Sequence, residues 1–308
     1  MTDVPLTAEE VRQQLQRRRR ETGEDFQQLL ERYALDRFLF RLGKSKHRRL
    51  LALKGAVLFS AWLGLPHRPT RDVDFAADLT ELDLDLARQV VTDVCAELVA
   101  PDGVTFHTAS ITAEEIREGA SYAGARVTLR ATIGTARIRL QVDIGFGDAF
   151  TPAPEIETLP PLLAQSPAAV LAYPRESVVA EKLEIITKLG RAHSRMKDYF
   201  DLRELAARFE YDLAGLADAV RNTFVRRRTP IPSGLPDGLS NDFSSDPQKI
   251  TQWSAFLRRI GHMDADTLEG CVSGVRSFAM PVFDLAREQD SSASGTWSPD
   301  SGWTQHAE

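Results

Sequence analysis

Apolar side chains recur at helical spacing at the start of the chain. Residues 7–33 carry an interrupted apolar stripe, and Thr7 with Glu10 has the form of a capping box. A second helix follows and ends near Gly43. The pattern therefore predicts that residues 1–49 form N-terminal helices that pack on the domain behind them. The apolar face of the second helix consists of Leu35, Phe38, Leu39 and Leu42.

Strand and helix patterns alternate over residues 50–150. Two segments around Gly134-Thr135 alternate clearly between apolar and polar residues, which predicts a β-hairpin. We expect an α+β core, with strands and flanking helices around one sheet. One predicted helix begins after Gly55, and a second spans residues 82–99. The predicted strands are 50–53, 72–75, 103–109, 122–132 and 135–146.

Residues 150–175 are rich in proline and poor in periodicity, which predicts a domain boundary. Residues 151–289 are then predicted to form a mainly helical C-terminal domain. From Asp290 to the end, Ser, Gly, Thr and acidic residues replace the apolar pattern, so residues 290–308 are expected to be a disordered tail. The predicted C-terminal helices are 177–189, 198–209, 213–224, 247–260 and 268–287.

Composition excludes several classes of protein. No apolar run reaches the roughly 18 residues of a membrane span, and the charged N-terminus does not resemble a secretory signal, so we expect a cytoplasmic protein. Cys95 and Cys271 are far apart, which argues against disulfides and thiolate zinc sites. The histidines form no zinc-hydrolase pattern. Chemistry based on oxygen ligands remains.

The net charge of −6 gives no overall attraction to nucleic acid, but it conceals three basic clusters. They are Arg17–Arg20, Lys44–Arg49 and Arg226–Arg228. Each cluster could be an ordinary solvated face, or it could lie along the path of a polynucleotide.

The segment from Leu53 to Phe75 carries the first candidate chemistry. Asp72 and Asp74 alternate with apolar residues in a short strand, so both carboxylates lie on one face. Two carboxylates about 6 to 7 Å apart repel each other unless a cation lies between them, and hard oxygen ligands suit Mg²⁺. Upstream, Gly55 permits close approach of the backbone, and the helix start favours a phosphate. The alternative is a solvated strand edge.

A third carboxylate is expected from a neighbouring strand. Asp143 ends the second arm of the predicted hairpin and is the best-placed candidate, with Asp148 as a weaker rival. A third carboxylate would give a cation held by Asp72 and Asp74 a further oxygen ligand. The alternative is a solvent-facing aspartate at the end of a strand.

A second motif lies beyond the proline-rich segment. Lys182 falls on the apolar stripe of the helix 177–189, so its stem can lie on the core while its ammonium group reaches a cleft and neutralises triphosphate charge. Asp198 follows in the segment Arg195–Leu202. Lys182 could instead be a surface residue, and Asp198 could simply cap the next helix.

These motifs resemble two nested families. Gly55, the helix behind it and Asp72-Val73-Asp74 are similar to the opening motif of the polymerase-β-like nucleotidyltransferase superfamily, although Ala56 stands where Gly or Ser is usual. Together with Ala180–Leu183 and Arg195–Leu202, they resemble the AbiEii-type nucleotidyltransferase toxins, which include the MenT toxins. The resemblance covers roughly residues 50–205.

The resemblance implies a mixed sheet with flanking helices, a helical C-terminal domain and a toxin of a toxin–antitoxin or phage-defence pair. Such a toxin uses Mg²⁺, or Mn²⁺ in its place, to transfer a nucleotide from an NTP to RNA. In several members the acceptor is the 3′ end of tRNA, so that translation stops. The implied partner is an antitoxin, an AbiEi-like transcriptional regulator.

The resemblance also implies a role for each matching residue. Asp72, Asp74, Lys182 and Asp198 would be catalytic, and Asp72, Asp74 and Asp143 would bind metal. The nucleotide would contact Lys54, Gly55, Ala56, Arg71 and Lys182.

Other functions stay open at this stage. The acceptor could be a small molecule or a protein side chain, or the chain could be a non-catalytic module that binds RNA or an antitoxin. A further hypothesis concerns Thr70, because phosphorylation beside the aspartates would add negative charge and three oxygens to the site.

Overall fold

The computed structural model describes residues 5–63, 72–77, 83–117, 123–147, 150–262, 266–288 and 294–305. Thr70, Arg71 and Asp148 therefore lie outside the described residues. The chain divides into two compact units. The first comprises residues 1–148 and 154–173, and the second comprises residues 149–153 and 174–308.

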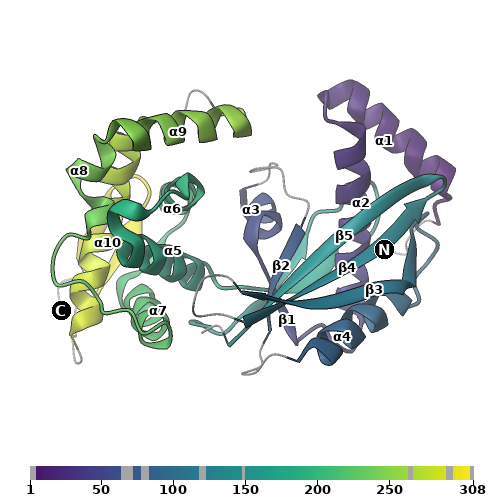
Figure 1. Ribbon diagram of the computed structural model, residues 1–308, viewed down its shortest axis with the longest axis horizontal. Coiled ribbons are helices and arrows are strands. Elements are labelled where there is room, and N and C mark those ends of the chain that lie inside the picture. Colours follow the sequence, from purple (N-terminus) through teal and green to yellow (C-terminus); the bar gives the residue numbers. More distant parts are fainter. Residues whose placement is uncertain are drawn as a thin grey trace. The chain divides into compact units, whose positions relative to one another are not determined.

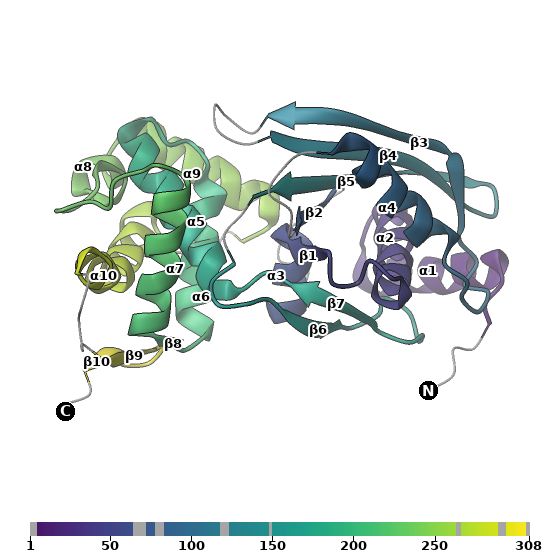
Figure 2. The same cartoon turned by 90° about the horizontal axis from the view of Figure 1, so that it is seen from below.

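The first unit is built on a seven-stranded mixed sheet in the order β3-β4-β5-β2-β1-β7-β6. Figure 1 labels β1 to β5, and Figure 2 also labels β6 and β7. Strand β2 runs parallel to β5, β1 runs parallel to β7, and the other neighbours are antiparallel. The strands are β1 (Leu51–Lys54), β2 (Asp72–Ala77), β3 (Thr105–Arg117), β4 (Ala123–Ile133), β5 (Ala136–Phe146), β6 (Glu155–Leu159) and β7 (Ala168–Ala172).

Alternation along β4 and β5 gives the sheet an apolar face and a polar face. The apolar residues of both strands are buried, for example Val127 and Val142, which are directly opposite each other. Helices α2 (Phe26–Lys44) and α4 (Leu84–Ala96) pack against the sheet and each other. The remaining helices of this unit are α1 (Ala8–Thr22) and α3 (Gly55–Leu63). The hairpin predicted around Gly134-Thr135 is confirmed, since Ile133 pairs with Ala136.

Two details differ from the sequence-based prediction. The stripe over 7–33 is not one helix, because Gly23 adopts a left-handed conformation that ends α1 and Asp25 caps the start of α2. The proline-rich segment contains β6 and β7 and returns to the sheet, where Leu171 pairs with Ala52. The segment lacks a regular pattern because its strands are short, and β7 is buried at four of five positions.

The second unit is mainly helical. It contains the helices α5 (Arg175–Leu189), α6 (Met196–Arg208), α7 (Leu213–Arg226), α8 (Asn241–Ser244), α9 (Pro247–Ile260) and α10 (Leu268–Arg287). The prediction of an α+β fold, with a mixed sheet and flanking helices followed by a helical C-terminal part, is thus confirmed.

The C-terminal segment is not a disordered tail over its described part. Residues 294–305 contain β9 (Gly295–Ser298) and β10 (Gly302–Gln305), which form a three-stranded sheet with β8 (Tyr211–Asp212), as Figure 2 shows. Trp303 stacks on Phe278 of α10, and Trp297 packs edge to face against the same ring. Both tryptophans donate hydrogen bonds to backbone carbonyl groups. Two tryptophans supply the apolar area that the polar composition concealed.

Among the described residues, no helix combines the length and hydropathy needed to cross a membrane. Cys95 and Cys271 are both free thiols.

Candidate active site

Three carboxylates meet at the centre of the seven-stranded sheet. Asp74 of β2 lies directly opposite Asp143 of β5 in the parallel ladder, and Asp72 lies opposite Gln141. One carboxylate oxygen from each of Asp72, Asp74 and Asp143 lies within 4.8 Å of the other two. The structure therefore brings together the aspartates that the sequence named as metal ligands.

Gly55 lies against this cluster. Its φ of +72° is unfavourable for other residues, and a Cβ atom at this position would lie 2.2 Å from Oδ2 of Asp74. Only glycine therefore allows the Asp74 carboxylate to sit above this turn. Lys54 lies opposite Asp74 in the β1–β2 ladder, with its ammonium group 4.2 Å from the centre of the Tyr173 ring. Ala56 is 2% exposed, so it offers a ligand only its backbone.

Arg126 is a member of this site that the sequence analysis missed. Its guanidinium group donates two hydrogen bonds to the Asp143 carboxylate, at 2.9 and 2.8 Å, and Gln141 donates a third at 3.2 Å. Hydrogen bonding to Asp143 raises the pKa of Arg126, and the charges of Asp143, Glu114 and Asp72 add to this effect. Asp143 thus has a cationic partner, while Asp72 and Asp74 complete the negative side of the cluster.

The donor atoms of the cluster fit a divalent cation. Because carboxylate side chains can rotate, three oxygens that already lie within 4.8 Å of one another could converge on one cation. All three donors are carboxylates, which are the hard ligands this ion prefers. The residues present therefore fit the group, with Arg126 as a competing cation at Asp143.

Lys182 and Asp198 lie together in the second unit. The ammonium group of Lys182, on α5, donates hydrogen bonds to Asp198 at 3.0 Å and to Asp201 at 2.7 Å, both on α6. The two carboxylates are 1% exposed and the lysine side chain is 13% exposed. Lys182 is therefore neither a surface residue nor a simple snorkelling one. Asp198 is not the cap of α6, because Arg195 occupies the N-cap position of this helix.

Three neighbours of this pair were not predicted. Besides Asp201, the Nε atom of Arg195 lies 3.0 Å from Oδ2 of Asp198, and Nε2 of the buried His193 lies 3.4 Å from the same oxygen. Burial alone would raise the pKa of Asp198, but the charge of Lys182, with His193 and Arg195, holds that pKa below its ordinary value. We name Lys182, His193, Arg195, Asp198 and Asp201 the α5–α6 charge cluster.

The spacing of α6 contained a signal for Asp201. Residues three apart lie on one helical face, so the spacing predicts that Asp198 and Asp201 face the same neighbour. Because the two compact units are described separately, the expectation that Lys182 and Asp198 join the three aspartates in one site stays a prediction.

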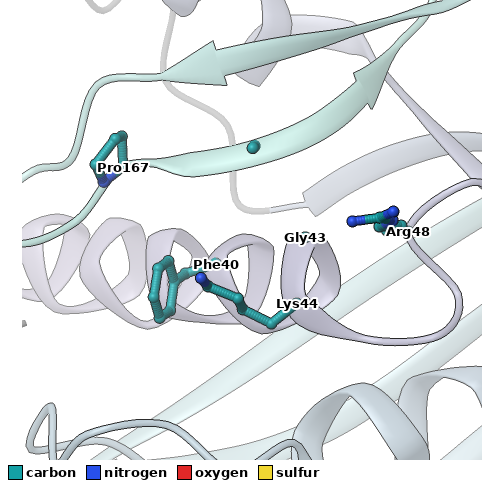
Figure 3. Close-up of a pocket in the computed structure, with 6 residues that line it drawn as sticks. Phe40, Gly43, Lys44, Arg48 and Pro167 are labelled. Carbon is teal, nitrogen blue, oxygen red and sulfur yellow. The ribbon is translucent and has the colours of Figure 1, made fainter. Parts of the chain in front are cut away.

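The basic clusters have different surroundings. Lys44 and Arg48 line a cavity of about 270 Å³ with Phe40, Gly43, Pro167 and Ala169 (Figure 3). In the same cluster, His47 and Lys46 bind Asp93 and lower the pKa of that carboxyl to about 2.

The cluster Arg226–Arg228 is partly structural. Arg227 forms ion pairs with Glu181 and Glu184, both at 3.1 Å. It therefore holds α5 rather than a ligand.

Comparisons with known proteins gave a family match and similar solved structures. Residues 37–287 match the model of a family described as the nucleotidyl transferase AbiEii toxin of type IV toxin–antitoxin systems. An H. pylori crystal structure assigned to the nucleotidyltransferases has 16% sequence identity and a TM-score of 0.47, over 87% of this chain and 100% of that chain. JHP933 from Helicobacter pylori has the same identity and TM-score, over 85% and 94%. The comparison with curated proteins gave no match.

The family match over most of the chain defines the protein as a nucleotidyltransferase, and therefore as an enzyme. The chain belongs to the AbiEii nucleotidyltransferase toxin family of type IV toxin–antitoxin systems, as the sequence motifs predicted. Membership implies an NTP substrate and an antitoxin partner. It also sets aside the alternative of a non-catalytic module.

Proposed function

We propose that this enzyme transfers a nucleotide from an NTP, with Mg²⁺, to an RNA acceptor, in the first place the 3′ end of tRNA, and so blocks translation. The observation that carries the proposal is the meeting of Asp72, Asp74 and Asp143 beside a glycine that no other residue can replace without moving Asp74. A modified tRNA 3′ end cannot accept an amino acid, which would make the transfer toxic.

Each residue of the carboxylate cluster has a distinct task in this proposal. Asp72 and Asp74 would hold the metal. Asp143 would add a further ligand when its hydrogen bonds with Arg126 are broken. A bound Mg²⁺ would lower the pKa of an attacking hydroxyl group and neutralise triphosphate charge. The backbone at Gly55 and Ala56 would receive a phosphate at the start of α3, and Lys54 and Arg71 would add positive charge.

The α5–α6 charge cluster supplies the second part of the proposal. Lys182 would bind the triphosphate and stabilise the charge of the leaving pyrophosphate. Asp198 would act as a base or would orient Lys182. With an ion pair on each side, Lys182 has a fixed position, and a fixed cation stabilises a transition state better than a mobile one.

The acceptor distinguishes this function from its alternatives. A small-molecule acceptor would need an enclosed pocket, whereas RNA needs exposed positive charge. The exposed positive charge of Lys44 and Arg48 favours RNA over a small molecule. A protein side chain remains the other alternative. We further propose an AbiEi-like transcriptional regulator as the antitoxin and the cytoplasm as the site of action.

The proposal is tested by incubating the protein with Mg²⁺, total tRNA and each of the four α-labelled NTPs. We expect label to appear on tRNA with one or more NTPs, and to disappear when EDTA is added. Asp72→Ala should reduce the labelling to background, because it removes a metal ligand. Undiminished labelling by Asp72→Ala would refute the assigned chemistry, and label on protein or on small molecules alone would refute the RNA acceptor.

A further inference from the structure

One polar face of the β4–β5 hairpin connects the carboxylate cluster with a group of arginines. On β5, residues two apart share a face, so Arg137, Arg139 and Gln141 lie on the same face as Asp143. On β4, Arg130 belongs to this face because it lies directly opposite Arg139. We name Arg130, Arg137 and Arg139 the arginine face. At about 3.4 Å per residue, Arg139 is about 14 Å and Arg137 about 20 Å from Asp143 along the strand.

The arrangement of these charges is unfavourable by itself. Arg130 and Arg139 form a direct cross-strand pair of like charge, and such pairs destabilise a sheet. All three side chains are exposed. Within the described part of the chain, no carboxylate lies within ion-pairing distance of any of them. In contrast, Arg126 on the same strand β4 forms an ion pair with Asp143.

An ordinary structural role does not account for the arginine face. Cations often protect the edge strands of a sheet from unwanted pairing, but β4 and β5 are interior strands. Ordinary solvated charges remain as an explanation, yet they give no reason for placing like charges opposite each other. An anion bound between the arginines would relieve their repulsion, as Mg²⁺ would for the aspartates.

The position of the arginine face indicates which anion binds there. It lies on the same sheet face as Asp143, yet its distance from the cluster exceeds what a triphosphate held at Asp72 and Asp74 would require. A polynucleotide supplies a further phosphate with every nucleotide, and arginine is the preferred partner of phosphate. We infer that the acceptor RNA strand lies along the β4–β5 hairpin, with its phosphates on Arg130, Arg139 and Arg137 and its 3′ end directed toward the aspartates.

This inference rests on the proposed function, and it assigns a binding surface for the acceptor. His107 lies opposite Arg130 on β3 and is also exposed, so it borders the same path. The surface belongs wholly to the first unit.

The test compares two triple variants with the wild-type chain. The first is Arg130→Gln/Arg137→Gln/Arg139→Gln, and the matched control is Arg17→Gln/Arg19→Gln/Arg20→Gln on α1. Each variant removes three exposed arginines, so both change the net charge by the same amount. Binding of 5′-labelled tRNA, and of a short single-stranded RNA, is measured without NTP over a series of salt concentrations. Transfer is measured separately at varied RNA and varied NTP.

We expect the first variant to bind RNA about tenfold more weakly or worse at moderate salt. The slope of log affinity against log salt should fall by about 2, because three single-strand phosphate contacts contribute about 0.7 each. The KM for RNA should rise, while the KM for NTP stays unchanged. The thermal midpoint should be equal or higher, because the like-charge pair is gone. The α1 variant should keep wild-type binding and KM.

Four outcomes would overturn the inference. An unchanged salt slope in the first variant would show that these three arginines do not contact phosphates. An equal loss in the α1 variant would show that binding follows net charge alone. If the first variant labels RNA with wild-type kcat/KM, only the arginine face is refuted. If the wild-type chain neither binds nor labels RNA, the proposed acceptor itself fails, and a DNA or protein acceptor becomes the alternative.

Discussion

Gly55 is the residue on which the position of Asp74 depends. We predict that Gly55→Ala lowers nucleotidyl transfer about 100-fold or more, because a displacement of about 1 Å at a catalytic group has an effect of this size. The reason is that the new Cβ atom would lie 2.2 Å from the Asp74 carboxylate. Transfer rates and urea unfolding of the purified variant give the measurement.

Gly23→Ala is the control for this prediction. Gly23 has nearly the same φ, +73°, but an added Cβ would meet no atom within 4 Å. It should cost about 1 kcal/mol of stability from backbone strain and leave the transfer rate unchanged. Equal activity losses in the two variants would show that strain, and not the displacement of Asp74, explains the effect.

Arg126 balances the charge of Asp143 before a metal binds. We predict that Arg126→Gln destabilises the protein by about 1 to 3 kcal/mol in EDTA. The variant leaves the half-buried Asp143 carboxylate without its cationic partner, next to the carboxylates of Asp72 and Asp74. Mg²⁺ should then raise the thermal midpoint more in the variant than in the wild-type chain. Arg139→Gln, which touches no carboxylate among the described residues, should respond to Mg²⁺ as wild type does. An identical Mg²⁺ response in Arg126→Gln would contradict the role of Asp143 as a metal ligand.

Ion pairs join helices α5 and α6, and the pKa values of the paired groups determine the pH range in which these pairs stabilise the protein. The pKa of Asp198 is lowered in the folded state, so its contribution is present above about pH 4 and is lost as pH falls through the folded value. Burial would lower the pKa of Lys182, but Asp201 and Asp198 raise it, so its contribution is present below about pH 10 and is lost above.

We therefore predict a plateau in the effect of Asp198→Asn on the free energy of unfolding. The loss should be about 2 to 4 kcal/mol between about pH 5 and pH 9, and it should shrink toward pH 3 and toward pH 11. Urea unfolding across this range provides the test. Asp242→Asn, which breaks an exposed pair with Arg191, should cost less than about 1 kcal/mol at every pH. A constant loss for Asp198→Asn at low pH would contradict the assignment.

Local patterns predicted some elements well and left others hidden. The hairpin at Gly134-Thr135 fixes its own register, because a two-residue turn leaves no freedom in the pairing. That register alone places Arg126 beside Asp143, so this partner was within reach of the sequence. The strand β7 was not, because it pairs with residues more than a hundred positions earlier and is buried without alternation.

At the scale of the whole molecule, the sequence predicts both groups of site residues but not their junction. Asp72, Asp74 and Asp143 meet through strand register, and Lys182 meets Asp198 through two consecutive helices. Register along β5 and spacing along α6 are local rules, but the pairing of β2 with β5 and the packing of α5 on α6 are not, so these meetings were predicted from the family resemblance. The relation between the units depends on three crossings of the chain, at residues 148–149, 153–154 and 173–174, for which no local rule exists.

The last prediction tests whether the two units share one nucleotide. If Lys182 binds the triphosphate that the aspartates hold through Mg²⁺, Lys182→Met should weaken binding of a non-hydrolysable NTP about tenfold or more and reduce transfer further, since the contact strengthens in the transition state. Lys188→Met is the matched control, because Lys188 lies on the same helix, its side chain is 41% exposed, and its ion pair with Glu184 is long, at 4.0 Å. Calorimetric titration with Mg²⁺ present measures the affinity, and unfolding curves report stability separately. If Lys182→Met only destabilises the protein and binds the nucleotide as the control does, then Lys182 holds α5 to α6 and the triphosphate depends on the first unit alone.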